Sequence, residues 1–384
     1  MKIGIDADPL SRPDGGIRRA LTEILRELQR IDQENHYYLY SKNDFDLPLE
    51  NPRWHKCIHP RIPFMLGRLY LLRGMEPLDG NRGLDVFLLS RPHAFPFGLA
   101  RTTARVALVY DLVWILYPDT MEWFNRVATG AFAGRAIRQA DRIISISAST
   151  SRDMKQLLGT PSEKIDVVHL GVSARFLPRD RASSARLIAE KYAASPDYIC
   201  TVGTVEPRKN LTTLIEAIGI LHDRGQWRLQ LLIAGGSGWK NSGIYASVRR
   251  RGLTEREVKF LGRVPDDDLS VLYAGARLFV FPSLYEGFGL PLIEAMASGV
   301  PVVASNVSSV PEVVADAGVL VSPPCPEEFA DAIARVTGDP DLSRTLANRG
   351  WKRAQQFTWE AVGKKVLRVL QESAACKAQR KRRA

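Results

Sequence analysis

Two glutamates eight residues apart, Glu286 and Glu294, are the residues whose type and spacing point most directly to chemistry. Paired carboxylates can act as acid and base, or they can accept hydrogen bonds from the hydroxyl groups of a ligand. An apolar run at 278–281 precedes Glu286, and Pro291 can begin a helix. We therefore expect Glu286 on a loop and Glu294 in the first turn of that helix. The alternative for Glu294 is a purely structural role, as a favourable partner of the helix dipole.

Adjacent basic residues, Arg208 and Lys209, form a second candidate group. They follow the apolar run 198–202 and precede the helical pattern 211–223. Cations at a helix N-terminus, where backbone N–H groups have no partners in the helix, form an anion site that suits a phosphate group. The alternative is a pair of exposed charges. The nearby Glu206 is ambiguous, because a carboxylate at a helix start is sufficiently explained by the helix dipole.

Short β-branched runs alternate with longer amphipathic stretches along the whole chain, a pattern typical of parallel α/β structure. Strands are expected over 2–6, 36–40, 86–89, 105–110, 142–147 and 164–169, and then over 198–202, 229–234, 258–261, 278–281, 302–304 and 319–321. Helices are expected over 17–29, 121–139, 148–158, 211–223, 245–251, 267–274, 292–298 and 327–336. The two halves therefore predict two facing Rossmann-like domains with a cleft between them, where ligands bind at the carboxyl ends of the strands.

The domain boundaries follow from a polar, proline-containing segment at 175–184. We expect an N-terminal domain over 1–180 and a C-terminal domain over 190–357. A last helix at 358–375 is expected to pack back towards the N-terminal domain. A basic tail would follow at 376–384.

The composition is that of a globular protein, with 45% hydrophobic residues and a net charge of +11 over 384 residues. No apolar run is long enough for a transmembrane helix, and the first residues read directly into a strand, so neither a membrane span nor a signal peptide is expected. Four scattered cysteines favour a reducing cytoplasm. Basic and aromatic residues interleave at 53–73, and the tail is basic, which favours peripheral binding to an anionic membrane over nucleic acid.

Further motifs join the two glutamates in a fixed order. They are Gly4-Ile-Asp6-Ala followed by Asp14-Gly15-Gly16-Ile-Arg18, Ile144-Ser-Ile-Ser147-Ala-Ser149, Val202-Gly-Thr-Val-Glu206-Pro-Arg208-Lys209-Asn210-Leu211, Phe260-Leu-Gly262-Arg-Val264 and Phe357-Thr-Trp359. Together with Glu286-x7-Glu294 they resemble glycosyltransferase family 4, a family of retaining enzymes with the GT-B fold. The resemblance covers nearly the whole chain.

The resemblance implies that the N-terminal domain over 1–180 binds the acceptor and that the C-terminal domain over 190–357 binds a nucleoside diphosphate sugar, the donor. It also assigns roles to the residues that bind this donor. Arg208 and Lys209 would hold the diphosphate leaving group, whose growing negative charge fixed cations stabilise. Glu294 would accept from the ribose hydroxyls, and Glu286 would orient the transferred sugar. The full donor-binding set is Gly15, Gly16, Arg208, Lys209, Val264, Glu286, Gly287, Phe288, Gly289, Leu290 and Glu294, in which Val264 meets the base and the glycine loops bring backbone close to the ligand.

The chain departs from the family pattern in two places. Tyr110-Asp111-Leu112 stands where many relatives carry His-Asp-Leu, and Thr204 stands where some carry another phosphate-binding Arg. Tyr110 and His93 are candidate groups on the acceptor side. The catalytic candidates are Glu286, Arg208, Lys209 and Asp111. Asp111 could instead hold its own loop by an Asx turn, so front-face displacement is favoured, with the leaving phosphate taking the acceptor proton.

These observations predict a retaining hexosyltransferase acting on a glycan acceptor, a lipid-linked bacterial polysaccharide or lipopolysaccharide precursor. GDP-mannose is the first expectation for the donor, followed by UDP-glucose and dTDP-rhamnose. No cofactor and no metal are expected, since the Asp6–Asp8 and Asp339–Asp341 pairs read as turns. The enzyme would work on the inner face of the cytoplasmic membrane. A nucleotide-sugar epimerase of the same fold and a catalytically silent nucleotide-sugar-binding subunit are the alternatives.

Overall fold

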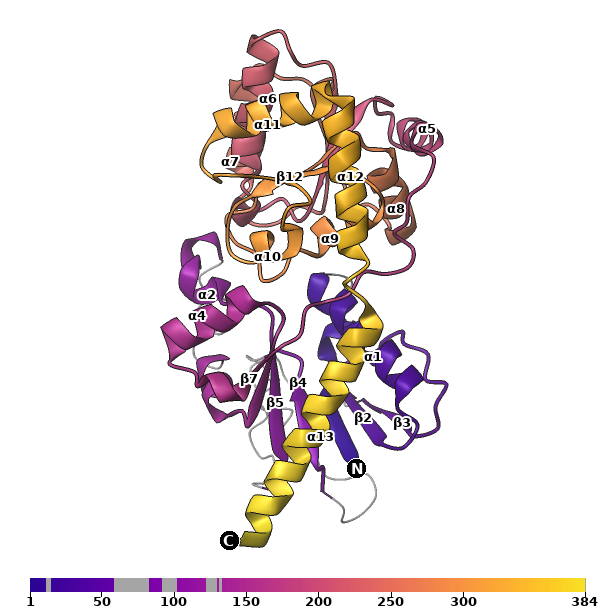
Figure 1. The fold of residues 1–384 in the computed structure, drawn as a ribbon, viewed down its shortest axis with the longest axis vertical. Helices are drawn as coiled ribbons and strands as arrows, with labels where there is room; N and C mark the ends of the chain where they lie inside the picture. Colours follow the sequence, from indigo (N-terminus) through magenta and orange to yellow (C-terminus); the bar gives the residue numbers. More distant parts are fainter. Residues whose placement is uncertain (12–14, 59–82, 92–101, 122–129, 131–132, 384) are drawn as a thin grey trace. The chain divides into compact units, whose positions relative to one another are not determined.

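The computed structural model describes residues 1–11, 15–58, 83–91, 102–121, 130 and 133–383. The chain divides into two compact units (Figure 1). Unit 1 comprises Met1–Leu116, Trp123–Gly171 and Trp359–Ala384, and unit 2 comprises Tyr117–Glu122 and Val172–Thr358. Each unit is built around its own parallel sheet, which confirms the expected α/β fold class with two Rossmann-like domains.

The described part of unit 1 contains a seven-stranded sheet with the order β3-β2-β1-β4-β5-β6-β7, and every strand pairing in it is parallel. Its strands are β1 (Lys2–Asp6), β2 (His36–Ser41), β3 (Trp54–Ile58), β4 (Val86–Leu89), β5 (Ala104–Val109), β6 (Arg142–Ser145) and β7 (Ile165–Val167). The order reverses direction between β1 and β4. In a doubly wound sheet, such a reversal opens a crevice at the carboxyl ends of the two strands.

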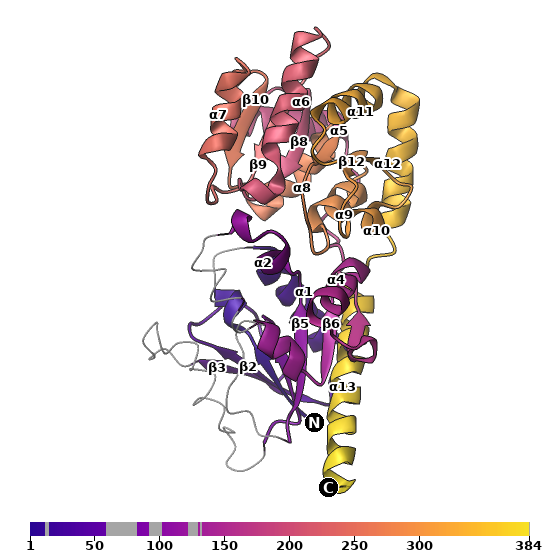
Figure 2. The ribbon, with the colours of Figure 1, turned by 90° about the vertical axis from the view of Figure 1, so that its left-hand side faces the viewer.

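Helices flank the sheet of unit 1. They include α1 (Gly16–Ile31), α2 (Val113–Leu116), α4 (Ala148–Leu158) and α13 (Trp359–Arg383), with the short 3-10 turns η1 (Asp8–Ser11) and η4 (Ser162–Lys164). Helix α13, the last element of the chain, packs against α1 and over β4, β5 and β6 (Figure 2). Its buried Val362, Val366 and Leu370 recur at intervals of four residues, the spacing of one face of a helix.

The described part of unit 2 contains a six-stranded parallel sheet with the order β10-β9-β8-β11-β12-β13. Its strands are β8 (Tyr198–Val202), β9 (Gln230–Ala234), β10 (Val258–Gly262), β11 (Phe279–Phe281), β12 (Val302–Ser305) and β13 (Val319–Val321). The sheet reverses its winding between β8 and β11. The crevice of unit 2 is therefore expected at the ends of these two central strands.

The helices of unit 2 are α5 (Arg181–Tyr192), α6 (Leu211–Asp223), α7 (Ser242–Arg250), α8 (Asp266–Gly275), α9 (Leu290–Ala297), α10 (Val310–Val314), α11 (Pro326–Gly338) and α12 (Pro340–Ala354), with the 3-10 turn η5 (Pro207–Lys209). Helices α6 and α11 lie side by side (Figure 1). Leu214 and Ile218 of α6 share one apolar core with Phe329 and Ile333 of α11, and all four are fully buried.

The structure corrects three expectations about the elements. Strand β3 lies within residues 53–73, the basic and aromatic segment that was expected to bind a membrane surface. Helix α5 begins within the expected interdomain connection, at Arg181, and the division between the two units falls before that connection, at Gly171 and Val172. Helix α13 continues to Arg383, so residues 376–383 are part of this helix and not a separate tail. Two features favour the longer helix: Ala, Gln, Lys and Arg have high helix propensity, and Lys377 forms an ion pair with Asp141 at 2.9 Å. In the described ranges, no helix combines the length and the apolar character needed to cross a membrane.

Candidate active site in unit 2

The winding reversal between β8 and β11 brings the two main candidate groups together. Arg208 and Lys209 lie in η5, the turn that follows β8, and Glu286 lies on the loop that follows β11. A backbone hydrogen bond of 2.9 Å from Leu284 N to the Arg208 carbonyl joins the two segments. The side chain of Asn210 reaches the carbonyls of Pro282 and Pro323 at 3.1 and 2.8 Å. These contacts fix the basic turn against the ends of the neighbouring strands.

Two cations and two carboxylates form one cluster here. Lys209 Nζ lies 2.6 Å from Glu286 Oε1, and Arg208 Nη1 lies 3.1 Å from Glu286 Oε2. Arg208 Nη2 donates to Glu206 Oε1 at 2.7 Å. The formal charges of the four groups therefore cancel in the absence of a ligand. The sequence predicted the cations and Glu286, but it left Glu206 unassigned.

Burial gives this cluster its electrostatic strength. The side chain of Glu286 is 10% exposed and that of Lys209 is 13% exposed, so water screens their attraction little. Burial by itself raises the pKa of Glu286, but Lys209 and Arg208 outweigh it and hold this pKa at about 2. Burial also lowers the pKa of Lys209, an effect that Glu286 opposes. The Ser283 hydroxyl, although it does not reach hydrogen-bond geometry, lies close enough to the Glu286 carboxylate to lower its pKa further.

The lysine stem is held by close packing. Gly203, which follows β8, lies so near this stem that an added Cβ would be 3.2 Å from Lys209 Cε. The Phe281 ring also lies near the lysine, with its centroid 5.4 Å from Lys209 Nζ. A side chain at position 203 would therefore press on the lysine, and the glycine lets it extend to Glu286.

The loop that carries Glu286 is fixed by two serines that sequence reasoning missed. Glu286 N donates to Ser308 Oγ at 2.9 Å, and Ser309 Oγ donates to the carbonyls of Glu286 and Phe288 at 2.9 and 3.0 Å. Ser308 has a φ of 47°, a left-handed conformation that a residue with a side chain rarely adopts. Ser309 is fully buried. The only sequence signal was a pair of serines shortly after β12, which is too common a feature to single out.

Glu294 occupies a different environment. It is the fifth residue of α9, which places it in the second turn of the helix rather than in the expected first turn. The residue is 2% exposed, and Tyr273 of α8 donates its hydroxyl to Glu294 Oε2 at 3.1 Å. Pro291 does lie at the start of the helix, and Gly299 follows its end with a φ of 75°. The Glu294 carboxylate is thus hydrogen-bonded within unit 2, and its binding to a ribose stays a prediction.

The remaining donor-binding candidates fall into three places. Gly287, Phe288, Gly289 and Leu290 connect Glu286 to α9, where Gly289 has a φ of 100° that favours glycine and Phe288 packs edge-on against Phe357. Val264 is partly buried and lies just after β10. Gly15 and Gly16 lie in unit 1, at the start of α1.

The unit 1 candidates lie near the winding reversal of its own sheet. Tyr110 follows β5, and burial raises the pKa of its hydroxyl far above neutral pH, so it stays protonated. Asp111 Oδ1 accepts from Val113 N at 3.1 Å, the Asx-turn geometry of the structural alternative.

Asp6 and Asp8 both pair with Arg91, at 3.7 and 2.6 Å. Residues 92–101, which include His93, lie outside the described residues.

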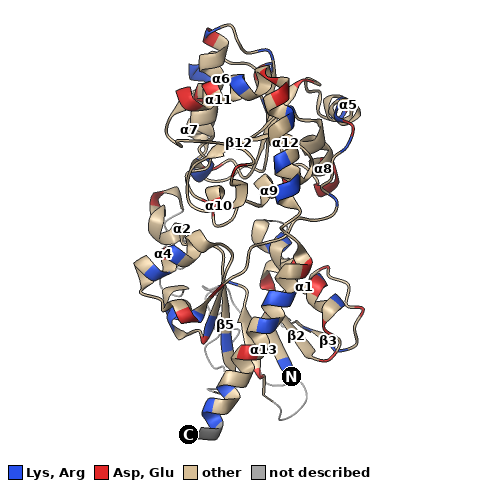
Figure 3. Ribbon diagram, in the orientation of Figure 1, with Lys and Arg blue, Asp and Glu red and all other residues tan. Residues whose placement is uncertain are grey.

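The expected membrane-binding segments are only partly described. Trp54 is buried and stacks on Tyr37, with 4.0 Å between ring centroids, so it belongs to the core of unit 1 rather than to a membrane-facing surface. Residues 59–82 lie outside the described part of the chain. Lys and Arg recur along α13 (Figure 3), where Arg380 and Lys381 are exposed.

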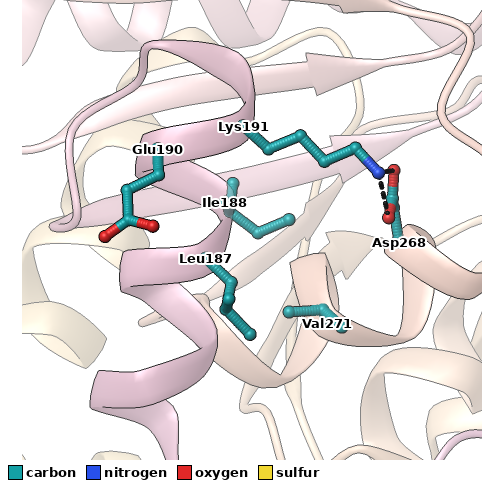
Figure 4. Close-up of a pocket in the computed structure, with 6 residues that line it drawn as sticks. All are labelled: Leu187, Ile188, Glu190, Lys191, Asp268 and Val271. Atoms are coloured by element: carbon teal, nitrogen blue, oxygen red, sulfur yellow. Dashed lines mark hydrogen bonds and ion pairs between the residues drawn. The ribbon is translucent and has the colours of Figure 1, made fainter.

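A pocket of about 470 Å³ lies between α5 and α8 (Figure 4). Leu187, Ile188 and Val271 form its apolar part, and the ion pair between Lys191 and Asp268, at 2.7 Å, lies at its side. None of the candidate donor-binding residues lines this pocket.

Comparison with known proteins covers both units. The family described as glycosyltransferase family 4 matches residues 14–176, and that described as glycosyl transferases group 1 matches residues 187–353. The O-antigen chain mannosyltransferase B of Escherichia coli is 37% identical, with 94% of this chain and 97% of that protein covered.

Two more distant relatives, one found by sequence and one by structure, are also similar to this chain. The serotype-specific mannosyltransferase WbdA of Escherichia coli is 30% identical over 58% of this chain and 27% of that longer protein. The sucrose-phosphate synthase of Thermosynechococcus elongatus has the same fold, with a TM-score of 0.76 over 98% of this chain and 100% of that one at 23% identity. The chain therefore belongs to glycosyltransferase family 4, and it is a glycosyltransferase with the GT-B fold.

Proposed function

We propose that this glycosyltransferase transfers mannose from GDP-mannose, with retention of configuration, to a lipid-linked glycan precursor of a bacterial surface polysaccharide. The observation that carries the proposal is the near full-length similarity to an O-antigen chain mannosyltransferase. The second relative described above is also named as a mannosyltransferase. The paired cations at the winding reversal of unit 2 add the chemistry that a diphosphate leaving group requires.

The cation pair would stabilise the departing nucleoside diphosphate. Charge grows on the β-phosphate as the glycosidic bond breaks, and a partly buried Arg and Lys act on that charge more strongly than they would in water. Glu286 would orient the sugar by accepting from its hydroxyls. Glu294 would do the same for the ribose.

The acceptor proton would pass to the leaving phosphate in a front-face reaction. Tyr110 supports this route because its hydroxyl is protonated at neutral pH and cannot act as a base. Asp111 is engaged with the backbone of its own turn. A reaction without a metal is supported by the pairing of Asp6 and Asp8 with Arg91, and by Asp339, whose carboxylate caps α12 through Asp341 N and Leu342 N at 3.0 Å.

The donor is tested first by binding and then by turnover. Thermal unfolding with GDP, UDP, dTDP and ADP should show the largest stabilisation with GDP, because a ligand that binds only the folded state raises its stability. Incubation with GDP-mannose and a lipid-linked glycan acceptor should then yield an elongated acceptor with an α-linkage by NMR. A β-linkage would contradict retention. An altered sugar nucleotide without elongation would indicate an epimerase, and binding without turnover would indicate a silent subunit.

Contact with an anionic membrane is the part of the proposal that concerns localisation. Exposed Arg380 and Lys381 at the end of α13 would contribute to the electrostatic attraction. The full chain should co-sediment with vesicles that contain phosphatidylglycerol, and much less with purely zwitterionic vesicles. Arg380→Glu combined with Lys381→Glu should weaken that binding, whereas equal binding to both kinds of vesicle would refute it.

A further inference from the structure

Arg208 is held from several sides by groups of the same unit. One terminal nitrogen, Nη2, donates to Glu206 Oε1 at 2.7 Å. The other, Nη1, donates to the Tyr285 carbonyl at 2.8 Å and lies 3.1 Å from Glu286 Oε2. Because a guanidinium is planar and its N–H groups point in fixed directions, these contacts determine the orientation of the whole group.

The two carboxylates that contact Arg208 differ in how they are bound. Glu206 lies two residues before Arg208, where the turn η5 begins, and its side chain is only 3% exposed. Glu286 comes from a loop 77 residues farther along the chain from Lys209, and it is shared between Arg208 and Lys209. Glu286 therefore lies at both cations, whereas Glu206 lies at one edge of Arg208.

A diphosphate that binds Arg208 and Lys209 has to compete with Glu286, since this carboxylate already forms ion pairs with both. It need not compete with Glu206, because Glu206 uses the other terminal nitrogen of Arg208. Loss of Glu286 would free two cations for the ligand. Loss of Glu206 would instead leave a partly buried guanidinium without the carboxylate that orients its Nη2.

We propose that Glu206 is a positioning residue that keeps Arg208 directed at the diphosphate, and that Glu286 is an exchangeable counter-ion whose place at the two cations the diphosphate takes. This inference rests on the proposed function, because it assumes that unit 2 binds the diphosphate of the donor. It assigns opposite effects to two glutamates that contact the same arginine. A merely structural role for both would give effects of the same sign.

The experiment measures the dissociation constants of inorganic pyrophosphate and of GDP for the full chain by calorimetry. Glu286→Gln should tighten pyrophosphate binding by roughly tenfold, since one competing buried charge is removed. Glu206→Gln should weaken it by roughly tenfold, and Glu206→Asp should restore part of the loss. Circular dichroism of each variant confirms that it is folded.

A double variant separates positioning from general damage. If Glu206 acts through Arg208, then Glu206→Gln should have no further effect on pyrophosphate affinity once Arg208→Ala is present. Weaker binding in both single glutamate variants, or an undiminished effect of Glu206→Gln beside Arg208→Ala, overturns the inference. Failure of the wild-type chain to bind pyrophosphate or any nucleoside diphosphate would instead contradict the proposed function.

Discussion

Replacing Glu286 by glutamine should remove a defined part of the acid sensitivity of unit 2. The two cations hold the pKa of Glu286 at about 2, below its ordinary value of 4.5. A carboxyl whose pKa is lower in the folded state stabilises the fold at any pH well above its unfolded pKa, and this contribution is lost as the pH falls towards the folded pKa. For Glu286 the full contribution is roughly 3 kcal/mol at neutral pH.

The assay is urea unfolding of the wild type and of Glu286→Gln at about pH 6, 5, 4 and 3, followed by tryptophan fluorescence and circular dichroism. The difference in unfolding free energy between the two proteins isolates Glu286, because the other groups titrate in both. Linkage predicts that this difference shrinks by roughly 2 kcal/mol between about pH 6 and pH 3. Most of the change should fall below about pH 4.5.

A matched control is Glu190→Gln, which changes an exposed carboxylate on α5 in the same unit. Its difference from the wild type should stay nearly flat over the same pH range, since solvent-exposed charges contribute little. If the Glu286→Gln difference also stays within about 0.5 kcal/mol from pH 6 to pH 3, the buried ion pairs do not set the charge state of Glu286, and the electrostatic reasoning fails.

Three further changes test the packing around the site. Gly235→Ala should destabilise the chain by about 3 kcal/mol or more in urea unfolding, because the added Cβ would lie 1.9 Å from the backbone carbonyl oxygen of Gly203. The control Gly236→Ala should be nearly neutral, because the space around that position is open. Ser309→Ala should cost about 1–3 kcal/mol and lower kcat more than it raises the donor KM, since the donor loop loses a buried bridge between two carbonyls; an unchanged kcat would argue against a positioning role. Tyr273→Phe should lower the free energy of unfolding by about 1–2 kcal/mol in the same assay, because the buried carboxylate of Glu294 loses a hydrogen-bond donor. A stability equal to that of the wild type would show that this hydrogen bond contributes nothing.

Most strands were predictable from the sequence, because a strand in a parallel sheet is covered on both faces and is therefore a continuous apolar run. The run that became β8 was predicted at its observed bounds, and those of β1 and β13 were as well. Strand β3 was missed because His55 and Lys56 interrupt its apolar character, and its burial depends on Tyr37 from the neighbouring strand. Local patterns do not contain such long-range partners.

Helix α5 was missed for a related reason. Its segment reads as polar, and only Ser184, Ala185 and Ile188 are buried in it, so it lacks the apolar stripe that marks an amphipathic helix. The Asp180 side chain, which accepts from Ser183 N at 2.8 Å, caps the helix start. That capping pattern, an Asp before a run of good helix formers, was the available signal.

The site was predictable as a set of residues but not as a set of contacts. Arg208 and Lys209 stood out because they follow a strand and precede a helix, and Glu286 stood out because of its spacing from Glu294. Which groups pair depends on the sheet order, in which β11 lies next to β8 although the two strands are far apart in the chain. The sequence therefore could not show that Glu286 neutralises the phosphate-binding candidates in the absence of ligand.

The charge balance of the cluster limits what the two cations can do alone. Two cations and two carboxylates sum to zero, and the diphosphate of a nucleotide sugar adds about two negative charges at neutral pH. Under the proposed function, the charge that develops on the leaving group thus exceeds what Arg208 and Lys209 offset. Backbone N–H groups at the start of α9, where the helix dipole is positive, are the donors that the fold supplies next to the Glu286 loop. The left-handed Gly289 and the Ser309 bridge fix that backbone, so the geometry of the loop, rather than a further basic side chain, would complete the stabilisation.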